Sequence, residues 1–194
     1  KAVMITSPSN PTGTTIDFNV LDEVCKLAAS RGAWRIVDET YLDLADREPD
    51  GTEVKSVLAC DPDAIVCNSF SKFFGMTGWR LGYIIAPPNI IDRAKKVHDF
   101  LTVGAAAPLQ EAVVTGLKFG PDYYDDLLAK YTHKKELFLK GLDELKITHT
   151  DPEGAYYVLL DISEFGYESD LEFCEDLAHY AGVGAVPGSS FFRE

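Results

Sequence analysis

The chain has 194 residues, of which 46% are hydrophobic and 25% are charged, a composition typical of a globular protein with one large domain or two small ones. Acidic residues outnumber lysine and arginine by 31 to 18, which gives a net charge of −13. This charge argues against a surface for nucleic acids or anionic membranes and favours small-molecule chemistry.

Targeting and metal-binding signals are not found in the sequence. No apolar stretch approaches the length that spans a bilayer, and no segment resembles a signal peptide. The four cysteines show no CxxC spacing, so we expect reduced core thiols and a cytoplasmic location. The four histidines are scattered without the spacing of metal ligands, and no metal site is predicted.

Strand-like and helix-like segments alternate along the first ninety residues. Residues 17–30 carry apolar side chains at helical spacing. Short apolar runs typical of buried strands lie at residues 2–6, 33–37, 64–67 and 81–86. This alternation predicts an α/β fold with a mostly parallel, doubly wound sheet.

The next segments are predicted to be helical. Residues 90–117 hold helical patterns, with Pro108 starting or kinking a second segment. Residues 123–145 form one long amphipathic pattern, and residues 170–181 are a further expected helix.

The last third of the chain is expected to form a second domain. Two short strands are predicted there, at residues 156–160 and 184–186. Placing a boundary at Gly120 gives a large domain of residues 1–120, including linking helices, and a smaller α+β domain of residues 121–194.

Polar side chains follow the predicted strands. Ligands of doubly wound sheets bind beyond the carboxyl ends of the strands, so these side chains are expected to converge on one edge. They are Asn10, Asp38, Tyr41, Ser69, Ser71, Lys72 and Arg80.

This set of groups suits a flat aldehyde that carries a phosphate. A primary amine can condense with an aldehyde, while a guanidinium and hydroxyls can hold a phosphate. A carboxylate can keep a ring nitrogen protonated, and an amide and a phenol can contact a ring oxygen. The inventory describes a site for pyridoxal phosphate.

Each of these residues also has an ordinary structural explanation. Asn10 precedes a proline and could form a turn, Asp38 could cap a helix, and Arg80 could pair with a surface acid. Glu39 is expected to be structural, since it points away from Asp38 in an extended segment. Residues 69–72 also match the S-x-x-K pattern of serine hydrolases, but the companion motifs of those enzymes are absent.

Three motifs resemble those of the class I/II (fold-type I) pyridoxal-phosphate-dependent aminotransferases. They are Ser-Asn-Pro-Thr-Gly at residues 9–13, Asp-Glu-Thr-Tyr at residues 38–41, and Ser-Phe-Ser-Lys at residues 69–72, followed by Arg80. The resemblance extends along the whole chain, because Pro-Glu-Gly-Ala-Tyr-Tyr at residues 152–157 looks like part of the family's smaller domain.

The resemblance implies a role for each candidate residue. Lys72 would carry pyridoxal phosphate as a Schiff base and then move the substrate's Cα proton, and Asp38 would pair with the pyridinium nitrogen. Asn10 and Tyr41 would face the ring oxygen, which makes Lys72, Asp38 and Tyr41 the expected catalytic residues. The expected phosphate ligands are Ser69, Arg80 and, more weakly, Ser71.

The resemblance also implies that the chain is a fragment. The family's first phosphate-binding loop would lie before Lys1, and the arginine that binds the substrate carboxylate would lie after Glu194. Arg193 is not assigned that role. We expect no measurable aminotransferase activity from residues 1–194 alone. The full-length form is expected to be a homodimer that acts on an amino acid and a 2-oxo acid.

Two other functions share these motifs. One is another fold-type I enzyme, such as a carbon–sulfur lyase or a cyclopropane-forming synthase. The other is a non-catalytic, aminotransferase-like domain that binds the cofactor as a sensor.

Overall fold

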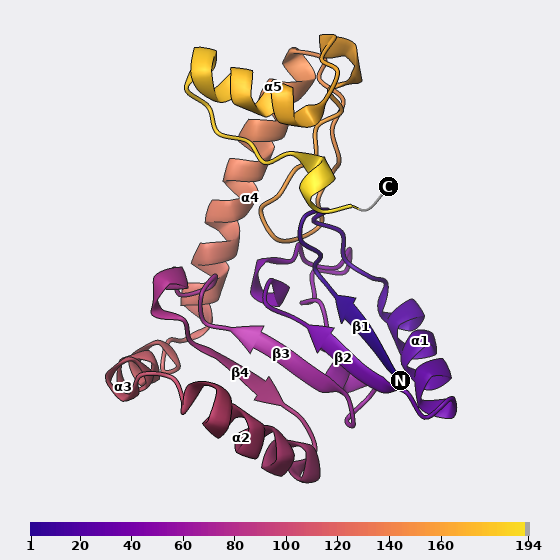
Figure 1. The fold of residues 1–194 in the computed structure, drawn as a ribbon, viewed down its shortest axis with the longest axis vertical. Coiled ribbons are helices and arrows are strands. Elements are labelled where there is room, and N and C mark those ends of the chain that lie inside the picture. Colours follow the sequence, from indigo (N-terminus) through magenta and orange to yellow (C-terminus); the bar gives the residue numbers. More distant parts are fainter. Residues whose placement is uncertain (193–194) are drawn as a thin grey trace.

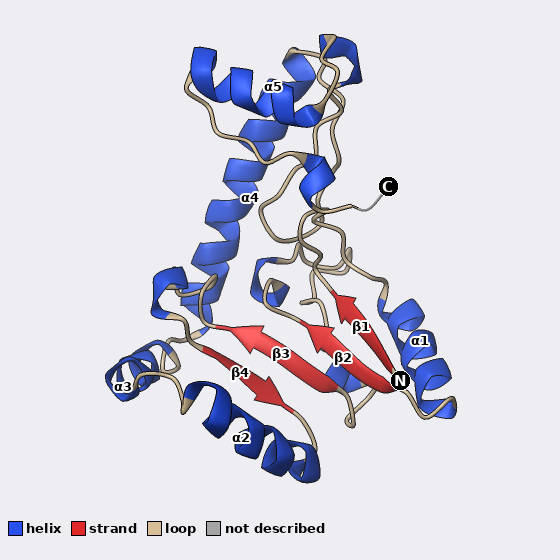
Figure 2. Cartoon of the chain, in the orientation of Figure 1, coloured by secondary structure: helices blue, strands red, loops and turns tan. Residues whose placement is uncertain are grey.

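The computed structural model describes residues 1–192, and Arg193 and Glu194 lie outside the described residues. A four-stranded sheet forms one part of the molecule, and a long helix leads from it to a mainly helical part (Figures 1 and 2). The strands are β1 (Ala2–Thr6), β2 (Trp34–Asp38), β3 (Ile65–Ser69) and β4 (Gly82–Ile85). The helices are α1 (Phe18–Ser30), α2 (Pro88–Thr102), α3 (Ala107–Gly116), α4 (Pro121–Glu144) and α5 (Asp170–Asp176).

The sheet is mixed, with the strand order β1-β2-β3-β4. β1 pairs with β2 and β2 with β3 in parallel, whereas β4 runs antiparallel to β3. The prediction of an α/β fold with a mostly parallel sheet is confirmed. The reversed direction of β4 places its first residue, Gly82, opposite Ser69 at the carboxyl end of β3. Residues just before β4 therefore reach the same sheet edge as residues just after β3 (Figure 2).

Gly82 is required by this pairing. A Cβ at this position would lie 2.8 Å from the carbonyl oxygen of Asn68, which is closer than real Cβ contacts allow. The absence of a side chain lets the two strands approach at the point where the candidate residues gather.

The core lies between the sheet and α1. Its buried residues come from the first three strands, from α1 and from the loop that precedes β3: Ile5, Leu21, Cys25, Val37, Val57, Ala64 and Val66. Helix α1 is capped by Asp17, the residue before its first turn, whose Oδ1 accepts hydrogen bonds from the backbone N–H groups of Asn19 (2.9 Å) and Val20 (3.1 Å). This N-cap fixes the start of the helix at the predicted position.

The helices after the sheet follow the sequence pattern. The predicted helical region of residues 90–117 is divided by Val103 and Gly104, and Pro108 lies in the first turn of α3, where a missing N–H costs nothing. Helix α4 matches the long amphipathic pattern, and α5 continues into a π-helix over Leu177–Ala181. Within the part of the chain that the structure describes, no helix is both long and apolar enough to cross a membrane.

The prediction of two strands after α4 is wrong. Residues 156–160 contribute a single antiparallel bridge between His149 and Leu160, and residues 184–186 pair with no described strand. A strand needs a partner along its whole length to bond its backbone groups, and an apolar sequence does not supply that partner. The described C-terminal part is therefore helices and loops.

Candidate active site

Lys72 lies in the turn that follows β3, and its neighbours hold it in place. Ser71 and Phe73 are buried, with 5% and 4% of their surface exposed, whereas Lys72 is half-buried. The Ser71 backbone N–H donates to Ser69 Oγ at 3.1 Å, which tightens the turn. The buried residues on both sides anchor the backbone of the half-buried Lys72.

The amine of Lys72 is surrounded by aromatic rings. Its Nζ lies 5.6 Å from the ring centroid of Tyr41 and 5.5 Å from that of Tyr156. The two rings meet edge to face, with centroids 5.5 Å apart. Burial raises the pKa of Tyr156, but the nearby Lys72 amine and the hydroxyls of Tyr41 and Tyr157 outweigh it and lower that pKa below its usual value.

The end of β2 supplies three polar side chains with different surroundings. Asp38 Oδ1 accepts a hydrogen bond from the Thr40 backbone N–H at 2.9 Å. Glu39 is buried, and its Oε1 accepts from the Val57 backbone N–H at 2.7 Å, so it serves the adjoining loop. Tyr41 is 5% exposed and lies against Lys72.

A hydrogen-bonded chain joins Asn10 to Tyr41 through Tyr157. Asn10 Nδ2 donates to the Tyr157 hydroxyl at 3.4 Å, and the hydroxyls of Tyr157 and Tyr41 lie 2.7 Å apart. Burial, together with these hydroxyl contacts, raises the pKa of Tyr41 above its ordinary value and keeps its hydroxyl protonated. Asn10 and Tyr41 are therefore both hydrogen-bonded to the phenolic oxygen of Tyr157.

The three predicted phosphate ligands lie at the same edge. The hydroxyl oxygens of Ser69 and Ser71 are hydrogen-bonded at 2.8 Å, and Ser69 Oγ also donates to the Leu81 carbonyl at 3.1 Å. The exposed Arg80 has a positive φ of 56° and donates from Nη1 to the Thr77 carbonyl at 2.8 Å. Among residues 1–192 no carboxylate pairs with Arg80, so most of its N–H groups face solvent.

The structure thus brings some of the predicted residues into one cluster and places others beside it. Asn10, Tyr41 and Lys72 are linked by direct contacts through Tyr156 and Tyr157. In the described part of the chain no hydrogen bond joins Asp38, Ser69 or Arg80 to Lys72. Those residues share its sheet edge. No group of three or more His, Cys, Asp or Glu side chains within residues 1–192 could hold a metal ion.

Tyr156 and Tyr157 belong to this cluster, although the sequence analysis did not assign them a role. They lie in the Pro-Glu-Gly-Ala-Tyr-Tyr segment, which drew attention only through its resemblance to a smaller domain. Their contacts with Tyr41 cross more than one hundred sequence positions, so no local pattern reveals them. The sequence signal that could have pointed to these residues is a pair of adjacent tyrosines directly after Gly-Ala.

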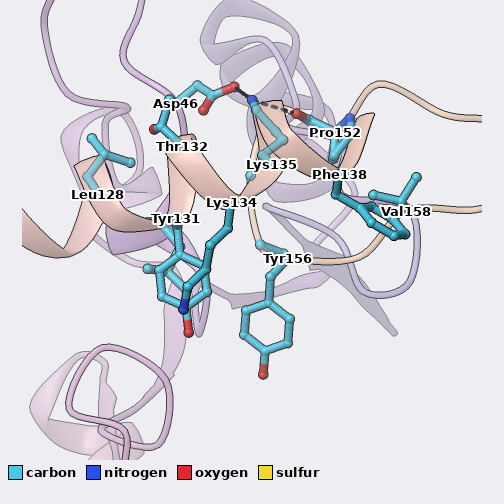
Figure 3. Close-up of a pocket in the computed structure, with 13 residues that line it drawn as sticks. Asp46, Leu128, Tyr131, Thr132, Lys134, Lys135, Phe138, Pro152, Tyr156 and Val158 are labelled. Atoms are coloured by element: carbon cyan, nitrogen blue, oxygen red, sulfur yellow. Dashed lines mark hydrogen bonds and ion pairs between the residues drawn. The ribbon is translucent and has the colours of Figure 1, made fainter. Parts of the chain in front are cut away.

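A cavity of about 320 Å³ opens beside the cluster, between α4 and residues 152–158 (Figure 3). Tyr156 lines both the cavity and the Lys72 cluster, and it stacks on Tyr131 with ring centroids 5.7 Å apart. Lys135 forms an ion pair with Asp46 and donates to the Pro152 carbonyl at 3.1 Å, which closes the opposite wall (Figure 3).

Comparisons with known proteins agree on one family. The sequence model of the class I and II aminotransferases matches residues 1–192, and the chain belongs to this family. The methionine aminotransferase of Escherichia coli is 30% identical over 191 residues, which are 98% of this chain and 50% of that protein. The aspartate aminotransferase of Pyrococcus horikoshii is 30% identical over 196 residues, which span this whole chain and 49% of that protein.

The fold agrees with that of solved aminotransferases. The structure of N-succinyldiaminopimelate aminotransferase from Mycobacterium tuberculosis superimposes with a TM-score of 0.91 at 27% identity. The match covers all of this chain and 50% of that one. The chain spans about half the length of the curated relatives it matches.

Proposed function

We propose that the chain is the cofactor-holding part of a pyridoxal-phosphate-dependent aminotransferase. The observation that carries this proposal is the cluster around Lys72. The amine of Lys72 lies against the Tyr41 ring, and Tyr41 and Asn10 are both hydrogen-bonded to the phenolic oxygen of Tyr157. The ring oxygen of the cofactor is also phenolic. The Asn10 amide and the Tyr41 hydroxyl, which can both hydrogen-bond to a phenolic oxygen, are therefore suited to bind it.

Each residue has a stated role in this proposal. Lys72 would hold the cofactor through its aldehyde, and its amine would be the group placed to move the proton at the substrate's Cα. Asp38 holds the proton on the ring nitrogen, and Asn10 and Tyr41 bind the ring oxygen. When bound, the cofactor supplies an electron-withdrawing ring next to the substrate's Cα.

The phosphate is assigned to the group at the start of β4. Arg80 has uncompensated N–H donors at the sheet edge, which suit two phosphate oxygens. Ser69 and Ser71 lie at the end of β3, opposite the first residue of β4, and add hydroxyl groups.

The wider assignment follows the family. The substrates are an amino acid and a 2-oxo acid. The relatives are named for methionine, aspartate and N-succinyldiaminopimelate, so the amino-acid side chain is left open. We further propose a cytoplasmic homodimer in which residues 1–120 belong to a large, doubly wound domain. Residues 121–194, whose described part is helices and loops, would be part of a smaller domain that is α+β as a whole.

Cofactor uptake by the purified chain tests this proposal. Titration with pyridoxal phosphate should produce the absorption band of covalently bound cofactor, and Lys72→Ala should abolish it. Lys134→Ala is a matched control, because Lys134 Nζ also lies over a tyrosine ring, 5.1 Å from the centroid of Tyr131. Undiminished uptake by Lys72→Ala would contradict the proposal, as would equal loss in both variants.

A further inference from the structure

Tyr157 occupies the centre of the hydrogen-bonded chain at the candidate site. Its hydroxyl is hydrogen-bonded to both Asn10 and Tyr41. Its ring also meets that of Tyr41 edge to face, with centroids 5.7 Å apart. Tyr157 touches the two residues assigned to the cofactor's ring oxygen, but it has no part in the proposed function.

The chemistry of the Asn10 amide fixes the direction of one of the two hydrogen bonds. The Asn10 amide nitrogen can only donate, so the Tyr157 oxygen accepts from it. The proton of the Tyr157 hydroxyl is then available to the Tyr41 oxygen, 2.7 Å away. Either hydroxyl of this pair can donate; when Tyr157 donates, Tyr41 keeps its own proton for a further acceptor. Asn10 likewise keeps a second amide N–H.

The backbone that carries Tyr157 is docked tightly against the loop after β1. The backbone N–H groups of Glu153 and Gly154 both donate to the Gly13 carbonyl at 2.9 Å. Glu153 Oε2 accepts from the Thr15 backbone N–H at 3.0 Å. These bonds join residues 152–157 to the loop that carries Asn10.

Two glycines make this approach possible. A Cβ on Gly13 would lie 2.4 Å from Pro152 Cβ, and a Cβ on Gly154 would lie 2.6 Å from Pro8 Cγ. Since neither contact leaves room for a side chain, the backbone of Tyr157 is fixed relative to Asn10.

We infer that Tyr157 is a positioning residue, which orients the Tyr41 hydroxyl and the Asn10 amide so that both donate to the ring oxygen of the cofactor. This inference rests on the proposed function. Tyr157 acts through Asn10 and Tyr41 and binds no cofactor atom itself. Its hydroxyl gives the Asn10 amide and the Tyr41 hydroxyl a common hydrogen-bond partner, which restricts the rotation of both groups.

The test compares two ligands in equilibrium titrations of the purified chain. The ligands are pyridoxal phosphate and an analogue with hydrogen in place of the ring hydroxyl. Tyr157→Phe should weaken apparent binding of pyridoxal phosphate about three- to tenfold, which corresponds to one hydrogen bond. Binding of the analogue should be unchanged, because it has no ring oxygen to receive the oriented donors. A merely structural role would weaken both ligands equally.

Two further variants sharpen the comparison. Tyr131→Phe removes a phenol one ring further from Tyr41, stacked on Tyr156, and should leave both affinities unchanged. The double variant Tyr41→Phe with Tyr157→Phe should lose less affinity than the sum of the two single variants, because part of the effect of Tyr157 passes through Tyr41. Additive losses would overturn the inference.

The outcomes separate the inference from the function on which it rests. If neither the unaltered chain nor Tyr157→Phe takes up pyridoxal phosphate, the proposed function fails and the inference fails with it. If both take it up with equal affinity, or if Tyr157→Phe weakens both ligands alike, only the inference is overturned. The unfolding midpoint of each variant shows that the compared proteins are folded.

Discussion

Asp38 ends β2 with one carboxylate oxygen already engaged. Its Oδ1 accepts the Thr40 backbone N–H, and this bond fixes the rotamer of the side chain. Within residues 1–192, Oδ2 has no hydrogen-bond partner. A fixed carboxylate with one free oxygen is suited to holding a single proton on a ring nitrogen.

Asp38→Asn tests this role directly. An amide cannot stabilise a protonated ring nitrogen as a carboxylate does, so the nitrogen should lose its proton while cofactor uptake through Lys72 is retained. Nitrogen-15 NMR of ring-labelled pyridoxal phosphate, bound at neutral pH, measures this protonation. A bound ring that stays protonated in Asp38→Asn would remove Asp38 from the role.

Glu39, next to Asp38, is a buried carboxyl group whose charge opposes folding. Burial raises the pKa of Glu39 above its ordinary value of 4.5, although its bond from the Val57 N–H acts in the opposite direction. A raised folded-state pKa contributes stability below the unfolded-state pKa, and this contribution is lost as the pH rises through the folded-state value.

Glu39→Gln keeps an acceptor oxygen for Val57 and removes the ionisable group. The free energy of unfolding of Glu39→Gln minus that of the unaltered chain should therefore be larger at pH 7 than at pH 4. Urea unfolding at the two pH values measures the difference. If this difference decreases as the pH rises from 4 to 7, the ionised carboxylate is favourable in its buried site.

At the scale of elements, the contact between the loop after β1 and residues 152–157 ties the two parts of the molecule together. The two glycine contacts in this region involve Gly13 and Gly154. Gly154 is buried, and a side chain there would also approach Ala45 Cα at 3.2 Å. Its neighbours are a rigid proline ring and backbone, which cannot move aside easily.

Gly154→Ala should lower the free energy of unfolding by about 1–3 kcal/mol through overpacking. Gly141→Ala is the matched control. Gly141 lies in α4 with no atom within 4 Å of its would-be Cβ, so alanine there should raise stability by about 0.5–1 kcal/mol. Chemical denaturation measures both values. Equal and small effects would mean that the contact is looser than the structure shows.

These elements also mark how far sequence reasoning reaches. The four strands of the sheet, α1 and α4 follow from local sequence patterns, because the residues that define each pattern lie within one element. The strand predicted at residues 156–160 failed because pairing depends on a partner distant in sequence.

The candidate site shows the same limit. Motif spacing indicated Asn10, Tyr41 and Lys72, which the structure links into one cluster. Tyr157 contacts Asn10 from 147 positions away, and its role depends on tertiary docking. Local patterns carry no information about such a contact.

At the scale of the whole molecule, large apolar side chains gather on the surface at the end of α2. Phe100 is 92% exposed, Leu101 75% and Val103 83%. Contiguous apolar surface of this kind favours association in water. We therefore predict that the chain sediments as an associated species and not as a 21.4 kDa monomer.

Charged substitutions at this surface should reverse the association. The double variant Phe100→Asp with Leu101→Asp should raise the dissociation constant of the associated species by about tenfold or more. Sedimentation velocity over a range of protein concentrations measures this constant. Tyr180→Asp is the control, because Tyr180 is 80% exposed but lies in the C-terminal helical part. If the control dissociates the chain equally well, the surface at the end of α2 is not the contact.

The central claim, that Lys72 is the attachment point of the cofactor, is tested most directly by chemical trapping. Borohydride reduces the bond between a lysine amine and the cofactor's aldehyde and makes it permanent, after which peptide mapping by mass spectrometry locates it. We predict that the pyridoxyl phosphate label lies on Lys72, in the peptide that follows β3. A label on any other lysine, or none after saturating pyridoxal phosphate, would contradict it.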